Sequence, residues 1–347
     1  MENLKPLVID LFADLDTRHY AEDFRQVPSL AKADITSAID YFIERYAVTH
    51  VIYGSGFESY PESLFYLDSR LIILGNTPET FLSLQNKPFF FAELAKSAIP
   101  YPAVAFHAPD FVDDWLVKPM QGQGGAGIKR YRPCDRLESF IYWQQYQHGT
   151  PHSVLFLADG DKAQVIGFNR QWLIDLGQDR EFIFSGVINS SDLSNTQKRL
   201  VSDWLNKLVP AFRLKGLNSL DFILTDEHLS VLEINARPSA SMQLYNDDLL
   251  IRHITACIAG LSSEDIAPIV RNGPRYTAYQ IVYAIRDVII PDRFDWPDGC
   301  MDLPDTGVIC RAGQPICSII AHQNDSEHVQ AQLLSLQQFI ITKLERF

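Results

Sequence analysis

The sequence WLVKPMQGQGGAGIKRY, from Trp115 to Tyr131, places a glycine-rich loop between two strand-forming runs. Residues 122–127 comprise four glycines, one alanine and one glutamine. Because glycine has no Cβ, such a loop brings backbone N–H groups close to a ligand, and N–H groups beside a lysine suit phosphate oxygens. We therefore predict a strand–loop–strand unit that binds phosphate. A flexible glycine hairpin without a ligand is the alternative.

The spacing of the glycines separates this loop from other phosphate motifs. Gly122, Gly124 and Gly127 match G-x-G-x-x-G, but a dinucleotide fold requires a helix there, and here a β-like run leads to Pro133. A P-loop needs Lys and then Ser or Thr directly after its last glycine, whereas Ile128 follows Gly127. A protein kinase is excluded because neither H-R-D nor D-F-G occurs in the sequence.

Length and charge limit the class of protein. With 347 residues, 46% of them hydrophobic, the chain can bury the core of two or three domains. A net charge of −13 argues against nucleic acid as the main partner. The five cysteines form no C-x-x-C pair, so neither a disulfide framework nor a zinc site is indicated. We expect a cytoplasmic protein, because the sequence shows no signal peptide and no apolar run of about 18 residues.

Alternating strand and helix patterns predict a small α/β domain with a parallel sheet over residues 1–85. Strands are expected at 6–12, 49–53 and 71–74, with a helix at 34–46 between the first two. Further along, a helix is expected over residues 90–97. Another should begin at the capping box Ser194–Gln197 and stop at Pro210. Its predicted buried residues are Leu200, Val201, Trp204, Leu205 and Leu208.

A second motif, SLDFILTDEHLSVLEINAR at residues 219–237, indicates two strands joined by a short turn. A hairpin in which Thr225 pairs with Leu229 places Asp221 opposite Glu233, with Asn235 on the same face. Like charges that pair directly destabilise a sheet, and Mg²⁺ shared with nucleotide phosphates would turn this repulsion into coordination. The alternative is a wet sheet face whose acids pair with arginines. The other face, directed to a core, carries Leu220, Phe222, Leu232 and Ile234.

With both motifs in place, the chain resembles the ATP-grasp superfamily, and within it the ATP-dependent carboligases related to biotin carboxylase. The resemblance implies an α/β (α+β) ATP-grasp fold with ATP and Mg²⁺ as cofactors. Lys87 and Lys118 correspond to lysines that hold ATP phosphates, and Arg237 to an arginine that stabilises the transferring phosphate. The other implied contacts are a lid at Gln121, Gly122, Gly124, Gly125 and Gly127, an adenine hinge at Gln144, Gln145, Tyr146 and Gln147, a ribose contact at His152, and magnesium ligands at Asp221, Glu233 and Asn235.

The resemblance also implies four parts of the chain. They are an N-terminal pre-ATP-grasp domain at 1–85, a small subdomain with the lid at 86–150, a catalytic subdomain at 151–270 and a β-rich C-terminal region at 271–347. The C-terminal likeness rests on Asp302-Leu303-Pro304, Gly307 and Gly313-Gln314-Pro315. Since Pro6–Phe12 matches the second strand of relatives, the first domain is expected to be truncated.

Two departures from the family pattern affect the expected chemistry. The hinge of relatives begins with Glu and ends with an apolar residue, whereas Gln144 and Gln147 stand here. An amide can still accept a hydrogen bond from the adenine amino group. Biotin carboxylases also carry a catalytic base, Glu, four residues after the arginine. Ser241 at that position argues against deprotonation of bicarbonate by the same route.

The reaction implied by the resemblance is transfer of the ATP γ-phosphate to a carboxylate, followed by attack of an amine on the acyl phosphate. We expect an ADP-forming carboxylate–amine ligase with small-molecule substrates, with pterin or furan cofactor biosynthesis as one setting. The acceptor pocket should lie where Gly54–Glu58 and Asp14–Arg18 approach Arg237. Neither nucleic acid nor a membrane is an expected partner, and a homodimer is one expected assembly. The alternatives are a biotin-independent carboxylase and a degenerate nucleotide-binding protein.

Overall fold

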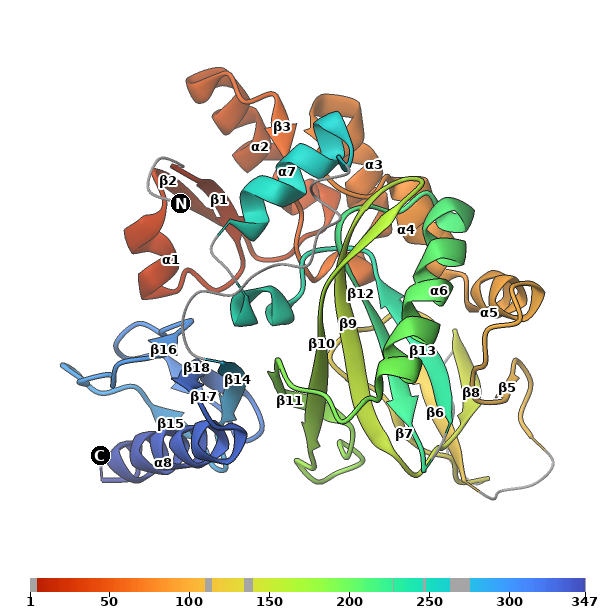
Figure 1. The fold of residues 1–347 in the computed structure, drawn as a ribbon. Coiled ribbons are helices and arrows are strands. Elements are labelled where there is room, and N and C mark those ends of the chain that lie inside the picture. The colour runs from red at the N-terminus through yellow and green to blue at the C-terminus, as the bar shows by residue number, and fades with distance from the viewer. Residues whose placement is uncertain are drawn as a thin grey trace.

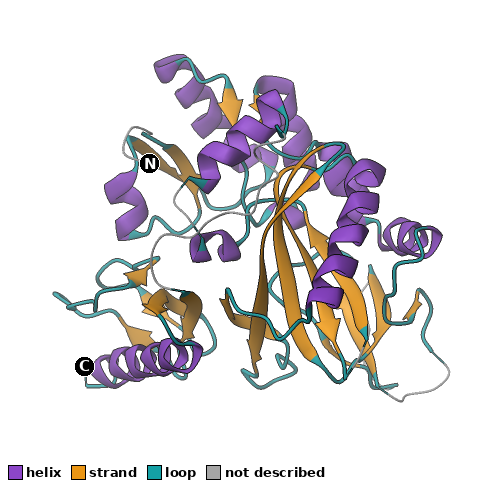
Figure 2. Ribbon diagram, in the orientation of Figure 1, coloured by secondary structure: helices purple, strands orange, loops and turns teal. Residues whose placement is uncertain are grey.

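The computed structural model describes residues 5–109, 114–133, 140–226, 228–245, 248–262 and 275–346. A helix-rich N-terminal region, a central pair of antiparallel sheets and a C-terminal region with one long helix follow one another along the chain (Figure 1). The predicted mixed α/β class is confirmed (Figure 2). None of the described helices has the length and apolar character needed to cross a membrane.

The N-terminal region contains parallel strands, as expected, but in two short sheets rather than one. β1 (Leu7–Asp10) pairs with β2 (Asp23–Gln26), and β3 (His50–Val51) pairs with β4 (Ile72–Ile73). Because these strands are only two to four residues long, packing of helices supplies most of the core. The helices are α1 (Leu15–Tyr20), α2 (Lys32–Tyr46), α3 (Pro61–Arg70) and α4 (Pro78–Gln85).

A side-chain cap fixes the start of α5 (Lys87–Lys96), the helix that leads to the site. Asn86 Oδ1 accepts a hydrogen bond from the Phe89 N–H at 3.2 Å, which satisfies one of the free donors of the first turn. The helix therefore begins three residues earlier than predicted. Lys87 becomes its first residue and is buried.

The two strands of the predicted strand–loop–strand unit are neighbours in a four-stranded antiparallel sheet. The strand order is β5-β8-β6-β7, and β6 pairs with β7 so that Leu116 faces Arg130. The bounds are β5 (Val104–Ala105), β6 (Trp115–Pro119), β7 (Lys129–Arg130) and β8 (Ile141–Gln145).

An eight-stranded sheet forms the centre of the molecule, in the order β13-β12-β9-β10-β11-β14-β18-β16. Alternate residues of β9 point to opposite faces, and both faces are covered. Val154 and Phe156 pack in the cluster that includes α6 (Asn195–Phe212), whereas Leu155 and Leu157 pack in the cluster that includes α7 (Leu249–Ala259). The first five strands are β13 (Leu229–Asn235), β12 (Lys215–Leu224), β9 (Thr150–Asp159), β10 (Ala163–Ile174) and β11 (Ile183–Ile188).

Helix α6 corrects two sequence-based expectations. It continues through Pro210 to Phe212, and Leu200 is 44% exposed rather than buried. Pro210 lies inside the helix, where it lacks the N–H of one helical bond, and the helix ends two residues later. The Arg213 N–H closes the helix on Val209 O. The buried stripe consists of Val201, Trp204, Leu205, Leu208, Val209 and Phe212.

The C-terminal strands extend the central sheet, and α8 (Ser326–Leu344) packs against β14 and β18 over a separate core. Segment Asp14–Arg18 contacts this region. Asp16 accepts from the Asp302 and Leu303 N–H groups, and Arg18 pairs with Asp305 at 2.7 Å. The remaining strands are β14 (Tyr276–Tyr283), β15 (Val288–Ile289), β16 (Cys300–Met301), β17 (Ile309–Cys310) and β18 (Pro315–Gln323).

Candidate active site

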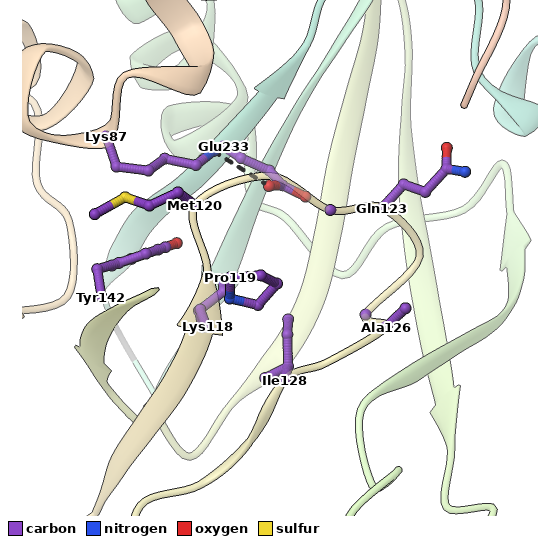
Figure 3. A pocket seen from close by; sticks show the side chains of 11 residues that line it. Lys87, Lys118, Pro119, Met120, Gln123, Ala126, Ile128, Tyr142 and Glu233 are labelled. Carbon is purple, nitrogen blue, oxygen red and sulfur yellow. Dashed lines mark ion pairs between the residues drawn. The ribbon is translucent and has the colours of Figure 1, made fainter. Parts of the chain in front are cut away.

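The glycine-rich loop, two lysines and one acid of the second motif line a single pocket (Figure 3). The pocket encloses about 320 Å³ of empty space, part of it open to solvent. Lys87 reaches it from the start of α5, Lys118 from β6 and Glu233 from β13. Its lining is Lys87, Lys118, Pro119, Met120, Gly122, Gln123, Gly125, Ala126, Ile128, Tyr142 and Glu233.

The loop needs glycine for two distinct reasons. Gly124, Gly125 and Gly127 have φ values of 60°, 80° and 78°, in the left-handed region that favours glycine. A Cβ on Gly125 would also lie 1.8 Å from the carbonyl oxygen of Phe182, so the backbone approaches the neighbouring sheet closely. The Phe184 N–H donates to Gly124 O at 3.0 Å and anchors the loop there. The loop is therefore shaped by contacts with the central sheet.

Both predicted phosphate lysines are buried. Lys87 Nζ lies 3.8 Å from Glu233 Oε2, and Lys118 Nζ donates to Gln144 Oε1 at 3.1 Å. Burial lowers the pKa of Lys118, and the negative charges of Glu233 and Asp221 oppose that change. Buried ammonium groups need anionic partners, so the pocket is suited to bind an anion.

Asp221 and Glu233 are paired directly across the β12–β13 hairpin, as predicted. Burial, followed by the charge of Glu233, raises the pKa of Asp221 to about 7. Burial alone would raise the pKa of Glu233 too, but Lys87, Lys118 and Arg237 bring it below its usual range. Two close carboxylates with opposed pKa shifts fit a site for a shared cation.

Two amide side chains contact Asp221. Asn235 Nδ2 donates to Asp221 Oδ2 at 3.0 Å, and Gln171 Nε2 lies 3.4 Å from Oδ1. Among the described residues no three His, Cys, Asp or Glu side chains form a metal-binding group. Two carboxylates, the amide oxygen of Asn235 and phosphate oxygens nevertheless match the donors that Mg²⁺ prefers.

A bulge in the hairpin explains why one part of the predicted register is right and another wrong. At the turn Leu224, not Thr225, pairs with Leu229. The register then shifts by one residue between Asp221 and Phe222, which leaves Leu232 as the extra residue and restores Asp221 opposite Glu233. Leu232 is accordingly only half-buried, and Val231 occupies the predicted core position.

Arg237 lies two residues beyond β13, against the N-terminal region. Its Nε donates to Glu58 Oε1 at 2.8 Å, and both side chains are nearly buried. The expected approach of Gly54–Glu58 is therefore confirmed. Segment Asp14–Arg18 is bonded to Leu303 and Asp305, and no hydrogen bond or ion pair joins it to Arg237 among the described residues, so its approach to Arg237 stays a prediction.

The candidate hinge and ribose residues include two buried polar atoms that lack partners. Gln144 Nε2 and His152 Nε2 form no hydrogen bond within the part of the chain that the structure describes. His152 Nδ1 bonds to Thr150 O at 3.0 Å, and burial lowers the pKa of the ring, so Nε2 is a free acceptor. Buried polar atoms normally have partners; these two are candidates for ligand contacts.

The structure thus brings together some of the predicted residues and leaves others outside the pocket lining. Tyr142 and Gln171 were not predicted. Tyr142 could have been found, since it lies two residues before Gln144 and shares its strand face. Predicted residues in the lining are Lys87, Lys118, Gly122, Gly125 and Glu233, whereas Gln121, Gly124, Gly127, Gln144, Gln145, Tyr146, Gln147, His152, Asp221, Asn235 and Arg237 lie outside it.

Comparison with known proteins gives the class. Residues 84–241 match the family model of the ATP-grasp domain. An uncharacterized protein of Methanocaldococcus jannaschii is 20% identical over 273 residues, which cover 73% of this chain and 64% of that protein. The chain therefore spans less than two thirds of the length of this curated relative.

Two solved structures share the fold over nearly the whole chain. One is the biotin carboxylase domain of Hydrogenobacter thermophilus 2-oxoglutarate carboxylase, solved as a dimer with MgADP and bicarbonate. It matches with a TM-score of 0.74 at 13% identity, and the match covers 96% of this chain and 84% of that chain. L-amino acid ligase from Bacillus licheniformis has a TM-score of 0.72 at 14% identity, with coverage of 96% and 97%. Residues 84–241 thus match an ATP-grasp domain, and the chain shares the fold of these two structures.

Proposed function

We propose that the protein is an ATP- and Mg²⁺-dependent, ADP-forming carboxylate–amine ligase. One observation carries the proposal: the glycine-rich loop, two buried lysines and Glu233 line one pocket, and Glu233 is paired with Asp221. The ATP-grasp domain and the MgADP in the Hydrogenobacter thermophilus structure support the choice of nucleotide and metal. The likeness to an L-amino acid ligase supports the reaction class.

Residues in and around the pocket divide the work of phosphoryl transfer. When bound, Mg²⁺ neutralises phosphate oxygens. Asp221, Glu233 and Asn235 would hold it, while Lys87, Lys118 and the loop N–H groups bind the phosphates. Arg237 would stabilise charge on the transferring group, and the closed loop would exclude water from the acyl phosphate. These residues would catalyse phosphoryl transfer by positioning the reactants and stabilising charge. The amine would then attack the acyl phosphate.

The surroundings of Ser241 favour an organic carboxylate over bicarbonate. Its hydroxyl lies 2.8 Å from that of Ser239, and no hydrogen bond or ion pair to a charged group is present at the Ser241 side chain within the described residues. A serine is a weak base unless an adjacent base activates it. A carboxylate substrate is already ionised at pH 7 and needs no base.

Measurement of ADP release in bicarbonate-depleted buffer tests the proposal. Amino acids and cofactor precursors would be screened as pairs of carboxylate and amine, and we expect ADP release to require both. Release stimulated by bicarbonate alone would instead favour the biotin-independent carboxylase. No release with any pair, despite tight binding of MgADP, would favour a protein without turnover.

Assembly as a homodimer is a further proposal, supported by the dimer in the Hydrogenobacter thermophilus structure.

A further inference from the structure

Three buried side chains of the N-terminal region hold the two residues that follow β13. Tyr53 Oη and Asn76 Nδ2 both donate to Ala236 O, at 3.1 and 3.0 Å. Glu58 Oε1 accepts from Arg237 Nε at 2.8 Å. The N-terminal region therefore fixes both the backbone before the arginine and its guanidinium.

The carboxylate of Glu58 is itself held in one orientation. Its second oxygen, Oε2, accepts from the Gly56 N–H at 2.7 Å. Gly56 has φ +108°, and a Cβ there would lie 2.7 Å from Leu30 Cδ1, so the turn that presents this N–H requires glycine. Both oxygens of Glu58 are thus engaged, and its side chain is 11% exposed.

The contact with Glu58 uses one of the five N–H donors of Arg237. Nη1 makes a long contact of 3.5 Å to Pro238 O, and Nη2 forms no hydrogen bond to any described residue. The terminal nitrogens therefore remain available to an anion, while Nε fixes the plane of the group. An arginine held in this way is preorganised for a phosphoryl group.

We propose that Glu58 is a positioning residue, which holds Arg237 through Nε so that the terminal nitrogens meet the transferring phosphoryl group. This inference rests on the proposed function. Glu58 acts through the arginine and has no contact of its own with the reacting atoms. It is not a competing anion, because its position is set by Gly56 and it occupies the Nε side of the guanidinium.

Binding of fluoroaluminate in the presence of MgADP tests the role, because this anion mimics the transferring phosphoryl group. Calorimetry would compare the wild type with Glu58→Ala, Glu58→Gln and Arg237→Ala. We expect Glu58→Ala to lower fluoroaluminate affinity by about tenfold and to leave MgADP affinity within about twofold, since Glu58 does not line the nucleotide pocket. Glu58→Gln keeps one acceptor for Nε but sets its amide nitrogen against the Gly56 N–H, so we expect an affinity between those of the wild type and Glu58→Ala. Asp305→Ala, which breaks the exposed pair with Arg18, is the matched control.

The outcomes separate the positioning role from its rivals. Wild-type fluoroaluminate affinity in Glu58→Ala would make the pair a structural tie, and tighter binding would make Glu58 a competing anion; either overturns the proposal. If Glu58→Ala fails to fold, Glu58→Asp replaces it, since the shorter side chain withdraws the acceptor and should show the same loss. Failure of the proposed function looks different. In that case the wild type binds no MgADP, or Arg237→Ala binds fluoroaluminate as tightly as the wild type.

Discussion

Lys118 Nζ lies 3.1 Å from Gln144 Oε1, which settles how the Gln144 amide is oriented. An ammonium group donates hydrogen bonds and accepts none, so the amide oxygen must face Lys118. The amide nitrogen then lies on the other side, buried and without a partner among the described residues. The free hydrogen-bonding group of this amide is therefore a donor. The expectation that the amide oxygen also accepts from the adenine amino group stays a prediction, since that oxygen has two lone pairs.

Replacement of Gln144 by Met should weaken nucleotide binding. The variant removes the buried donor that a nucleotide acceptor would satisfy, and one such hydrogen bond contributes about 0.5–1.5 kcal/mol, or up to about tenfold in affinity. Titration of MgADP by calorimetry measures the effect. Gln332→Met, at an exposed position on α8, is the control. Equal affinities in the two variants would show that Gln144 does not contact the nucleotide.

Substitution of Gly125 by Ala should displace the loop. The new Cβ would meet Phe182 O at 1.8 Å, and the backbone cannot yield without breaking the Phe184–Gly124 hydrogen bond. We expect MgADP affinity to fall by about tenfold or more, because misplaced N–H groups no longer reach the phosphates. Gly124→Ala is the control, since its φ is also positive but its Cβ meets nothing within 4 Å. A larger loss in Gly124→Ala than in Gly125→Ala would contradict this account.

The loop should also become protected when nucleotide binds. Lids of low local stability are cleaved from open states, and a bound ligand reduces the population of those states. Limited proteolysis with and without a non-hydrolysable ATP analogue measures the rate of cleavage near Gly124. Equal rates in the two conditions would show that the loop is not a lid.

The hairpin shows what sequence patterns could and could not predict. Strand periodicity predicts that the two acids share one face of the hairpin, and a one-residue slip would move a side chain to the other face. The predicted turn was wrong by one residue, and the bulge at Leu232 offset that error. Bulges depend on the twist and packing of the whole sheet, so no local pattern indicates this one.

Contacts between distant segments were harder to predict than the elements themselves. The G-rich loop and the capped helix starts follow from local chemistry, and the structure contains them. The docking of segment Asp14–Arg18 on Leu303 depends on how two regions fit together, so no local pattern predicts it. The close approach of Gly125 to Phe182 is of the same kind.

The stability of the unliganded protein should fall as pH rises toward and through 7, in part because of Asp14. Burial, then the charges of Asp302, Asp10 and Asp16, raise the pKa of Asp14 to about 7, with Arg18 opposing them. The folded state therefore binds this proton more tightly than the unfolded state does. Its contribution to stability is full below about pH 4 and is lost as pH rises through 7. Melting temperature against pH measures the effect.

Asp14→Asn should flatten this part of the pH profile, because the amide carries no charge at any pH. Asp226→Asn, at an exposed position after β12, should leave the profile unchanged. The account fails if Asp14→Asn melts with the same pH dependence as the wild type between pH 4 and 8.

Replacement of Glu233 by Gln should abolish magnesium-dependent turnover while the protein stays folded. The amide removes one of two anionic ligands from the predicted metal site and the partner of Lys87. Metal stabilisation of a phosphoryl group is worth several kcal/mol, so we expect ADP release to fall by about a hundredfold or more. The fold should persist, because the change relieves the repulsion between Glu233 and Asp221. ADP release as a function of Mg²⁺ concentration, with melting temperature as the check on folding, measures both effects, and Asp226→Asn is the control. A Glu233→Gln variant with wild-type turnover and magnesium dependence would remove Glu233 from the metal site.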